Sequence, residues 1–281
     1  MGRLSIYCLG IVSNIRECNM QKPDHVAKKI KQVFRRFVFF LFIPLLFFLA
    51  APRAYSQSAS EIIRRVDANQ QFSSEKFEMR MTIEKGKQKL VKTISGYGKN
   101  RGDYSFMEFT NTEDRGVKYL KIFDELWIYF PDADDIMKIS GHMLRQGMMG
   151  SDISYEDMMR REDLDKTYEV KLTGSEKIRG VDCFVVEMTA KTKDALYARQ
   201  ILYVDKNTFV PLRLELFAKG GRMLKTMEEF DIIKQGDRYF ARKIVIRDLR
   251  KKDSGTTVEI LQLQFNVPVS DDVFTRRNLR R

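Results

Sequence analysis

Short runs of alternating apolar and polar residues recur along most of this chain. From Lys76 to Ile83 every second residue is apolar, which is the pattern of a strand with one apolar side. Turn signals separate such runs; the paired glycines Gly220 and Gly221, for example, accept the positive φ that hairpin turns need. About eleven to thirteen runs follow one another at short spacing, so the sequence predicts an antiparallel sheet or barrel rather than βαβ units.

A helix is predicted before the first strand. Ser58-Ala59-Ser60-Glu61 is a capping box, in which the serine and the glutamate satisfy free backbone N–H groups at a helix start. Ile62, Ile63 and Val66 follow at helical spacing. At the other end of the chain, Val273 and Phe274 are expected to dock the tail onto the sheet.

One Met-rich stretch, residues 142–159, interrupts the strands. Ser154 followed by Asp157 indicates a helix start, so the stretch is predicted to form a loop and short helices between two halves of the sheet. Two interpretations stay open: a rigid plug at one end of a barrel, or a movable apolar lid whose unbranched side chains adapt to irregular partners. The candidate lid residues are Met143, Leu144, Met148, Met149, Met158 and Met159.

The N-terminal 56 residues have the features of an extension and a secretory signal peptide. A basic segment that includes Lys28 and Arg36 precedes the apolar run from Phe37 to Ala51, and cleavage is expected near Ser56. The start codon is Met1 or Met20. The sequence therefore predicts an exported protein with one domain at 57–281.

Charge and cysteine usage exclude some classes of protein. The whole chain has 50 Lys and Arg against 38 Asp and Glu, a net charge of +12. Residues 1–56 hold nine of the basic and two of the acidic residues, which leaves 41 against 36, a net charge of +5. Much of the basic charge that would favour a nucleic-acid partner therefore belongs to residues 1–56 and not to the mature chain. Cys183 is the only cysteine after the predicted cleavage point and lies in an apolar run, so a buried structural thiol is expected.

Catalytic and cofactor motifs are not recognisable in the mature part of the chain. His142 is its only histidine, and no metal-ligand spacing or nucleophile–histidine pair surrounds it. No glycine-rich phosphate loop is present, and no carboxylate pair is singled out by its spacing. We therefore expect no cofactor, no metal and no enzymatic activity.

The apolar strand faces suggest a ligand cavity instead. Inward side chains of a large or unclosed barrel can line a pocket, although an ordinary packed core would show the same periodicity. Alternation does not reveal which face is concave. The residues predicted to line the cavity are Phe77, Met79, Met81, Phe106 and Trp127.

A sequence signature in the Met-rich stretch carries a family resemblance. The run Met149-Gly150-Ser151-Asp152-Ile153-Ser154-Tyr155-Glu156-Asp157-Met158 resembles the MGSD-(F/I)-SYEDL signature of outer-membrane lipoprotein-sorting proteins of the LolA-like family. Leu126-Trp127-Ile128-Tyr129-Phe130-Pro131 resembles the W-x-Y-x-P strand end of that family. Tyr203-Val204-Asp205-Lys206, followed by Val210-Pro211, is similar to its W/Y-V-D-K hairpin.

This resemblance implies a mainly β fold: an unclosed antiparallel half-barrel of about eleven strands, with an N-terminal helix and a helical lid. It also implies a periplasmic carrier that binds acyl chains of lipoproteins, or lipids, and helps sort them to the outer membrane. A membrane transporter and an outer-membrane acceptor would then be partners. The alternatives that stay open are a lipid-binding or adaptor partner of a membrane transporter and, more remotely, a hydrolase.

The sequence departs from the resemblance at one position. The best-known carriers hold the lid with an arginine next to a lysine and a proline, whereas the run here is Lys99-Asn100-Arg101-Gly102. Arg101 is therefore the candidate cation for holding the lid, through Asp152 or Asp157.

Overall fold

The structure is a computed structural model that describes residues 57–159, 164–193 and 195–281. The predicted signal peptide lies outside the described residues, so its cleavage stays a prediction. No helix in the described ranges is long and apolar enough to cross a membrane.

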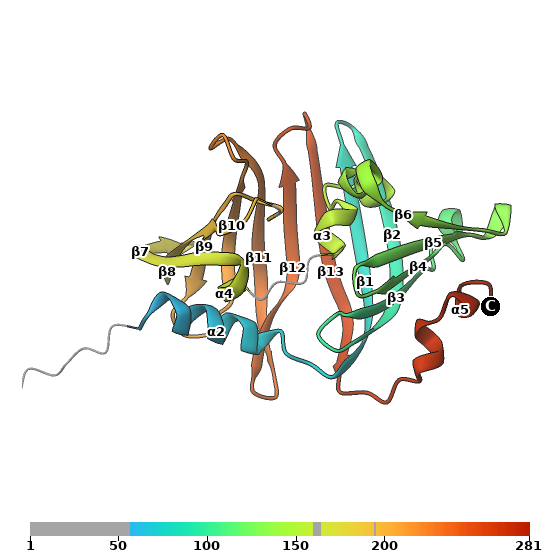
Figure 1. Ribbon diagram of the computed structural model, residues 1–281, viewed down its shortest axis with the longest axis horizontal. Helices are drawn as coiled ribbons and strands as arrows, with labels where there is room; N and C mark the ends of the chain where they lie inside the picture. Colours follow the sequence, from blue (N-terminus) through green and yellow to red (C-terminus); the bar gives the residue numbers. More distant parts are fainter. Residues whose placement is uncertain (1–56, 160–163, 194) are drawn as a thin grey trace, which may run out of the picture. The chain divides into compact units, whose positions relative to one another are not determined.

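Thirteen strands of the described chain form one sheet, and neighbouring strands are antiparallel (Figure 1). The strands are β1 (Ser74–Lys85), β2 (Gln88–Lys99), β3 (Tyr104–Phe109), β4 (Lys118–Ile122), β5 (Glu125–Phe130), β6 (Asp135–Ile139), β7 (Tyr168–Ile178), β8 (Val181–Ala190), β9 (Arg199–Asp205), β10 (Pro211–Phe217), β11 (Met223–Gln235), β12 (Arg238–Asp248) and β13 (Ser254–Phe265). Their order across the sheet is β6-β5-β4-β3-β2-β1-β13-β12-β11-β10-β9-β8-β7. Because β6 and β7 are its two edges, the sheet does not close, which confirms the predicted unclosed half-barrel.

Helix α2 (Ala59–Asn69) packs against one half of the sheet. Its N-cap is Ser58, whose Oγ accepts from the Glu61 N–H at 3.1 Å, and its buried face consists of Ile62, Ile63 and Val66, as predicted. The helix contacts both β7 and β12. An eleven-residue helix is about 16 Å long, whereas five strand spacings in a flat sheet span about 24 Å. The sheet must therefore curl around α2.

The described residues between β6 and β7, which include the Met-rich stretch, form four short helices. They are the 3₁₀ helices η3 (Gly141–Arg145) and η4 (Met148–Gly150) and the α-helices α3 (Tyr155–Met159) and α4 (Leu164–Thr167). We call residues 141–159 and 164–167 the insertion. Its position between β6 and β7 confirms that it separates two halves of the sheet.

One face of the sheet carries both α2 and the insertion, and we call it the inner face. A row of paired residues crosses it: Ile83, Thr256, Ile246, Met227, Leu214, Leu202 and Val186. Phe77 also lies on this face, opposite Gly96. A Cβ at Gly96 would lie 2.4 Å from the Phe106 carbonyl oxygen and 2.6 Å from the Phe77 ring, so this position accepts only glycine.

The outer face has its own smaller clusters. The turn η5 (Asp271–Phe274) and helix α5 (Arg276–Leu279) cover β3–β5, where Phe274 and Leu279 pack against the sheet. Cys183 is fully buried in a second outer cluster, and burial raises the pKa of its thiol. Both predictions, a docked tail and a buried structural cysteine, are confirmed. The remaining short helices are η1 (Thr112–Asp114) and η2 (Pro131–Ala133).

Candidate functional site

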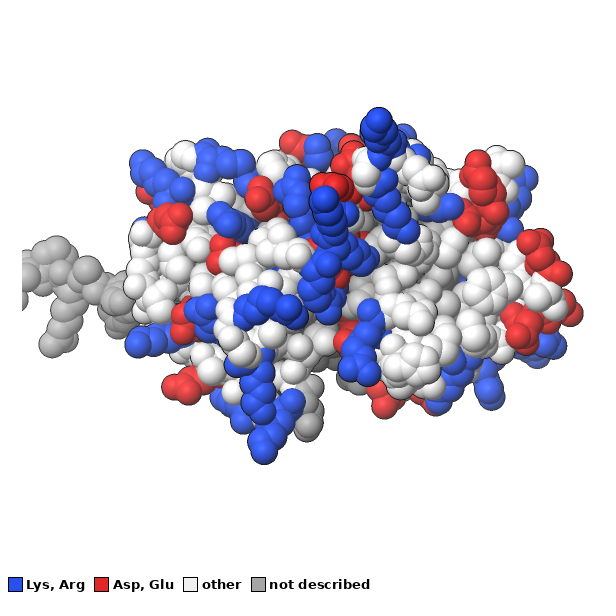
Figure 2. Space-filling model, turned by 90° about the horizontal axis from the view of Figure 1, so that it is seen from above, with Lys and Arg blue, Asp and Glu red and all other residues white. Residues whose placement is uncertain are grey.

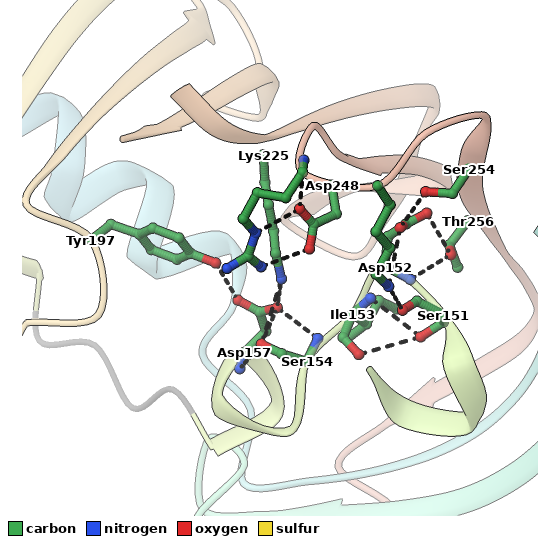
Figure 3. A network of polar contacts seen from close by, with 12 residues as sticks. Ser151, Asp152, Ile153, Ser154, Asp157, Tyr197, Lys225, Asp248, Ser254 and Thr256 are labelled. Atoms are coloured by element: carbon green, nitrogen blue, oxygen red, sulfur yellow. Dashed lines mark hydrogen bonds and ion pairs between the residues drawn. The ribbon is translucent and has the colours of Figure 1, made fainter. Parts of the chain in front are cut away.

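The signature run is fixed to the sheet by a network of buried polar contacts (Figure 3). Ser154 and Asp157 form the predicted cap of α3: the Ser154 N–H and Oγ donate to Asp157 Oδ2 at 2.8 and 2.7 Å, and the Asp157 N–H donates to Ser154 Oγ at 3.2 Å. The Lys225 ammonium on β11 pairs with Asp157 Oδ2, and the Tyr197 hydroxyl donates to Asp157 Oδ1 at 2.6 Å. Asp157 therefore joins the insertion to the opposite half of the sheet.

The charge of Asp157 is stabilised at this position. Burial alone would raise the pKa of the carboxyl, but the Lys225 ammonium and the hydrogen bonds from Lys225, Tyr197 and Ser154 outweigh it, so its pKa lies below the ordinary value. Lys225 itself is only 2% exposed. The Asp157 carboxylate and the Lys225 ammonium form a buried pair that would be costly to break from one side.

Asp152 makes a second attachment, to the β12–β13 hairpin. Its carboxylate is 1% exposed and accepts from Ser254 Oγ at 2.8 Å and Thr256 Oγ1 at 3.2 Å. Its own N–H donates to Thr256 Oγ1 at 2.8 Å. Lys251 Nζ lies 3.4 Å from Asp152 Oδ1 and also donates to the Ser151 carbonyl oxygen. The loop before α3 is thus bonded to two residues of β13 and one of the turn.

Basic side chains surround this attachment. The turns between β1 and β2 and between β12 and β13 carry exposed Lys85, Lys87, Arg250 and Lys252. Figure 2 shows a band of Lys and Arg across the middle of the face seen from above. Arg250 forms a bidentate pair with buried Asp248, with Nε at 2.8 Å from Oδ1 and the terminal nitrogen at 2.6 Å from Oδ2.

The apolar side of the insertion fills the inner face beside β1–β6. Met148 is buried in that cluster, and the other five predicted lid residues, Met143, Leu144, Met149, Met158 and Met159, pack against it. Tyr155 stacks on Tyr119 with ring centroids 6.1 Å apart, and their hydroxyls are 3.5 Å apart. The insertion therefore covers this half of the face, as expected for either a lid or a plug.

The other half of the inner face is hollow. A cavity of about 690 Å³ is bordered by α2, α3, α4 and strands β8–β11, and its apolar wall includes Val66, Leu164, Met188, Leu202, Leu214 and Met227. A second cavity of about 280 Å³ extends over β12, β13 and β1 and shares Val66, Gln70, Arg101, Pro211 and Glu229 with the first. The larger volume is within the range of about 300–1,000 Å³ that is usual for small-molecule sites.

Two carboxyls border these cavities without a polar partner among the described residues. Glu75 on β1 lines the smaller cavity, and Glu229 on β11 lines both. Desolvation raises the pKa of Glu75 to about 7 and that of Glu229 to about 8. Sequence analysis did not single them out, although Glu75 has the same parity as Phe77 and Met81. The signal that could have found Glu75 is an acidic residue at a strand position whose alternate neighbours are apolar.

The five residues predicted to line one cavity lie on two faces of the sheet, so that prediction was wrong as a set. Phe77, Met79 and Met81 lie on the inner face, in or against the cluster covered by the insertion. Phe106 and Trp127 lie on the outer face, under the C-terminal segment. Cross-strand pairing decides this, because Phe106 pairs with Tyr97, which lies on the opposite parity from Gly96 and Phe77.

The prediction that Arg101 holds the lid was also wrong. Within the described residues, Asp152 and Asp157 form their ion pairs with Lys251 and Lys225. Arg101 is exposed in a turn, has a φ of 56°, and borders both cavities. It belongs to the rim of the hollow half.

The described residues contain no group of three or more His, Cys, Asp and Glu side chains that could hold a metal ion. His142 lies exposed on η3.

Comparison with solved structures identifies the fold. A DUF1329 family protein from Desulfovibrio piger is 28% identical and superposes with a TM-score of 0.72, over 79% of this chain and 97% of that one. A domain described as outer membrane lipoprotein-sorting from Vibrio parahaemolyticus is 22% identical with a TM-score of 0.70, covering 79% and 97%. The LolA superfamily protein NE2245 from Nitrosomonas europaea is 19% identical with a TM-score of 0.64, covering 79% and 99%. No curated protein matches the sequence.

The chain thus has a LolA-like fold. A family model with the description "Uncharacterized protein" matches residues 101–281, and the chain belongs to that family.

Proposed function

We propose that the mature chain is a periplasmic carrier that binds acyl chains of lipoproteins, or lipids, in the hollow half of its inner face. The observation that carries this is the 690 Å³ cavity with its wall of methionine and leucine side chains. Each buried methylene contributes about 0.8 kcal/mol when it leaves water, so a carrier must shield the chain along its length. The adjoining 280 Å³ cavity extends the available path.

Three features of the predicted role depend on other observations. Export rests on the signal-like residues 1–56, and sorting to the outer membrane rests on the family resemblance. In that role the carrier would receive its cargo from a membrane transporter and pass it to an outer-membrane acceptor. The insertion is the proposed lid, because α3 and α4 border the cavity through Asp157 and Leu164 while the rest covers the other half.

Mass spectrometry of organic extracts tests the cargo directly. The chain from Gln57 onward, purified from periplasm without detergent, is expected to carry stoichiometric lipid or acylated peptide. A protein that holds no lipid but co-purifies with a membrane complex would favour the adaptor function instead. Turnover of ester substrates would favour a hydrolase.

A variant pair locates the site. Met227→Asp places a charge on the cavity wall, where it costs several kcal/mol if it displaces apolar contacts without gaining water, so binding of a fluorescent fatty acid should fall at least tenfold. Thr226→Asp is the control, since its neighbouring position on β11 faces the other side of the sheet. Equal binding by both variants would contradict this location of the site.

A further inference from the structure

Basic charge is concentrated on three turns at one end of the sheet. Residues 84–91 of the β1–β2 hairpin, 218–223 of the β10–β11 hairpin and 248–254 of the β12–β13 hairpin hold eight Lys and Arg against three Asp and Glu, a net charge of +5. The whole of residues 57–281 also carries +5, so its other residues balance at 33 basic and 33 acidic. We call the exposed side chains of these three segments the tip surface.

The three turns lie side by side. The Gly86 N–H donates to the Asp253 carbonyl oxygen at 2.7 Å, and the Leu249 N–H donates to the Leu224 carbonyl oxygen at 2.8 Å. Figure 1 shows the β1–β2 and β12–β13 hairpins reaching the top of the sheet, and Figure 2 shows the band of Lys and Arg from that side. The turns at the opposite ends of the same strands hold two basic and two acidic residues, so the excess charge belongs to one end only.

Most of these charges are available to a partner. Arg250 is paired with Asp248, and Lys251 with Asp152. The other six basic side chains of the tip surface are exposed and form no ion pair with the described residues: Lys85, Lys87, Lys89, Lys219, Arg222 and Lys252. An anionic partner can therefore bind them without displacing an acidic side chain of the protein.

Exposed apolar side chains accompany the lysines. Six large apolar side chains of the described residues are exposed, and three of them belong to the tip surface: Leu249 at 51%, Val91 at 44% and Leu90 at 39%. Leu249 is the most exposed of the six and directly precedes Arg250. Leu90 and Val91 are consecutive on β2 and point to opposite faces, so the three do not form one apolar patch of the kind found at the centre of a protein interface.

We propose that the tip surface docks the protein onto an anionic phospholipid bilayer, with the basic side chains among the head groups and Leu249 at the boundary of the acyl chains. Anionic leaflets attract clustered basic residues, and each Lys or Arg near such a surface contributes about fivefold to the affinity. Lysine is depleted at protein interfaces, but it suits the diffuse charge of a membrane, because an ammonium needs no fixed partner geometry. A leucine beside these lysines gains by leaving water at the interface.

Docking of this kind does not depend on what the cavities carry. The contacts involve the tips of three hairpins, whereas other residues border both cavities. The β5–β6 turn, at the right of Figure 1, limits the surface on one side, since Asp132 and Asp134 are exposed there and would be repelled. The protein should therefore dock through the middle of this end of the sheet and not through that edge.

Flotation with lipid vesicles tests the proposal on the chain from Gln57. The probes are vesicles of pure phosphatidylcholine and vesicles of equal parts phosphatidylcholine and phosphatidylglycerol. The protein should bind the anionic vesicles at least about thirtyfold more tightly than the neutral ones, as expected when several basic residues reach the surface. Its affinity for the anionic vesicles should fall at least about tenfold between roughly 0.1 and 0.3 M NaCl, because salt screens these charges.

A triple variant assigns the binding to the tip surface. Lys87→Gln, Lys219→Gln and Lys252→Gln together remove one exposed charge from each turn. The affinity for anionic vesicles should fall about a hundredfold, at about fivefold for each residue. Leu249→Ser tests the apolar part and should weaken binding several-fold without changing its salt dependence.

A matched triple variant is the control. Lys171→Gln, Lys177→Gln and Lys234→Gln together remove the same charge from exposed positions on β7 and β11, away from the three turns. Vesicle affinity should change by less than about threefold, because these positions lie beyond the reach of close electrostatic contact with the docked surface. Thermal unfolding midpoints equal to that of the wild type show that both triple variants fold.

Three results would overturn the proposal: no binding to any vesicle, equal binding to anionic and neutral vesicles, or equal losses in the two triple variants. Binding to poly-L-glutamate without binding to vesicles would assign the tip surface to an acidic protein partner instead. In each of these cases the carrier function would stand, since it concerns the cavity. A protein that docks on anionic vesicles but never contains lipid would keep the docking surface and lose the carrier function.

Discussion

The two halves of the inner face differ although one continuous sheet forms both. Beside β1–β6, the insertion packs its methionines onto Met81 and Tyr119, which are 0% and 1% exposed. Beside β8–β11, α2 covers the sheet with three buried residues and leaves the 690 Å³ cavity against Met227 and Leu214. A single eleven-residue helix cannot fill the width of the curved face, so space for a ligand lies under α2 rather than under the methionines.

The strongest test of this contrast compares two methionines on the same face. Met81→Ala removes packed atoms from the filled half and should cost about 3 kcal/mol of unfolding free energy, as for buried methionines in general. Met227→Ala borders an existing cavity and should cost less than about 1 kcal/mol. Urea unfolding of both variants measures this, and similar costs would mean that the two halves are packed alike.

The second test concerns the pair that joins the halves. Lys225→Met leaves the Asp157 carboxylate buried without its cation and should cost about 2–3 kcal/mol, at the lower end for a broken buried pair because Asp157 keeps its Tyr197 bond and some exposure. Lys177→Met is the control, since Lys177 and Asp182 form an exposed pair that should contribute little. Unfolding in urea at pH 7 compares them, and equal small losses would show that the Lys225 pair stabilises nothing.

The sequence predicted the strands, α2, the insertion and the docked tail because each depends on local periodicity or capping. It did not predict which strand faces coincide. Parity relates residues within one strand, whereas Phe77 and Phe106 are related only through the β1–β2 and β2–β3 registers. Lys225 is 68 residues from Asp157, and no local pattern connects them. The prediction chose Arg101 from a motif, whereas the actual partners of Asp157 and Asp152 are brought to them only by the fold.

The third test concerns the hollow half and pH. Glu229 has a folded pKa of about 8 against an ordinary value of 4.5. Between these values the unfolded chain releases the proton and the folded chain keeps it, so Glu229 lowers stability as pH rises from about 5 to 8. Glu229→Gln removes this loss and should be more stable than wild type by about 1–2 kcal/mol at pH 8, since water in the cavity reduces the full effect, and nearly equal at pH 5. Urea unfolding at both pH values checks it; a gain of the same size at pH 5 would point to a cause other than ionisation.

The smallest expected effect distinguishes Lys251 from Arg101 as holders of the insertion. Lys251 bonds Asp152 and the Ser151 carbonyl, but its side chain is 36% exposed, so solvent screening limits the pair to about 0.5 kcal/mol. Lys251→Met should therefore speed amide exchange across residues 147–154 about twofold, because local opening becomes easier by that amount. Arg101→Met should leave these rates unchanged and alter only ligand affinity at the rim. Hydrogen exchange followed by mass spectrometry, with and without a long-chain amphiphile, measures both.

The same measurement on the wild-type protein separates a lid from a plug. If the insertion is a lid, binding of the amphiphile must change the exchange rates of residues 147–154. If these residues are instead as protected as β1 in both states, the insertion is a fixed plug, and the amphiphile would have to enter the hollow half past α2.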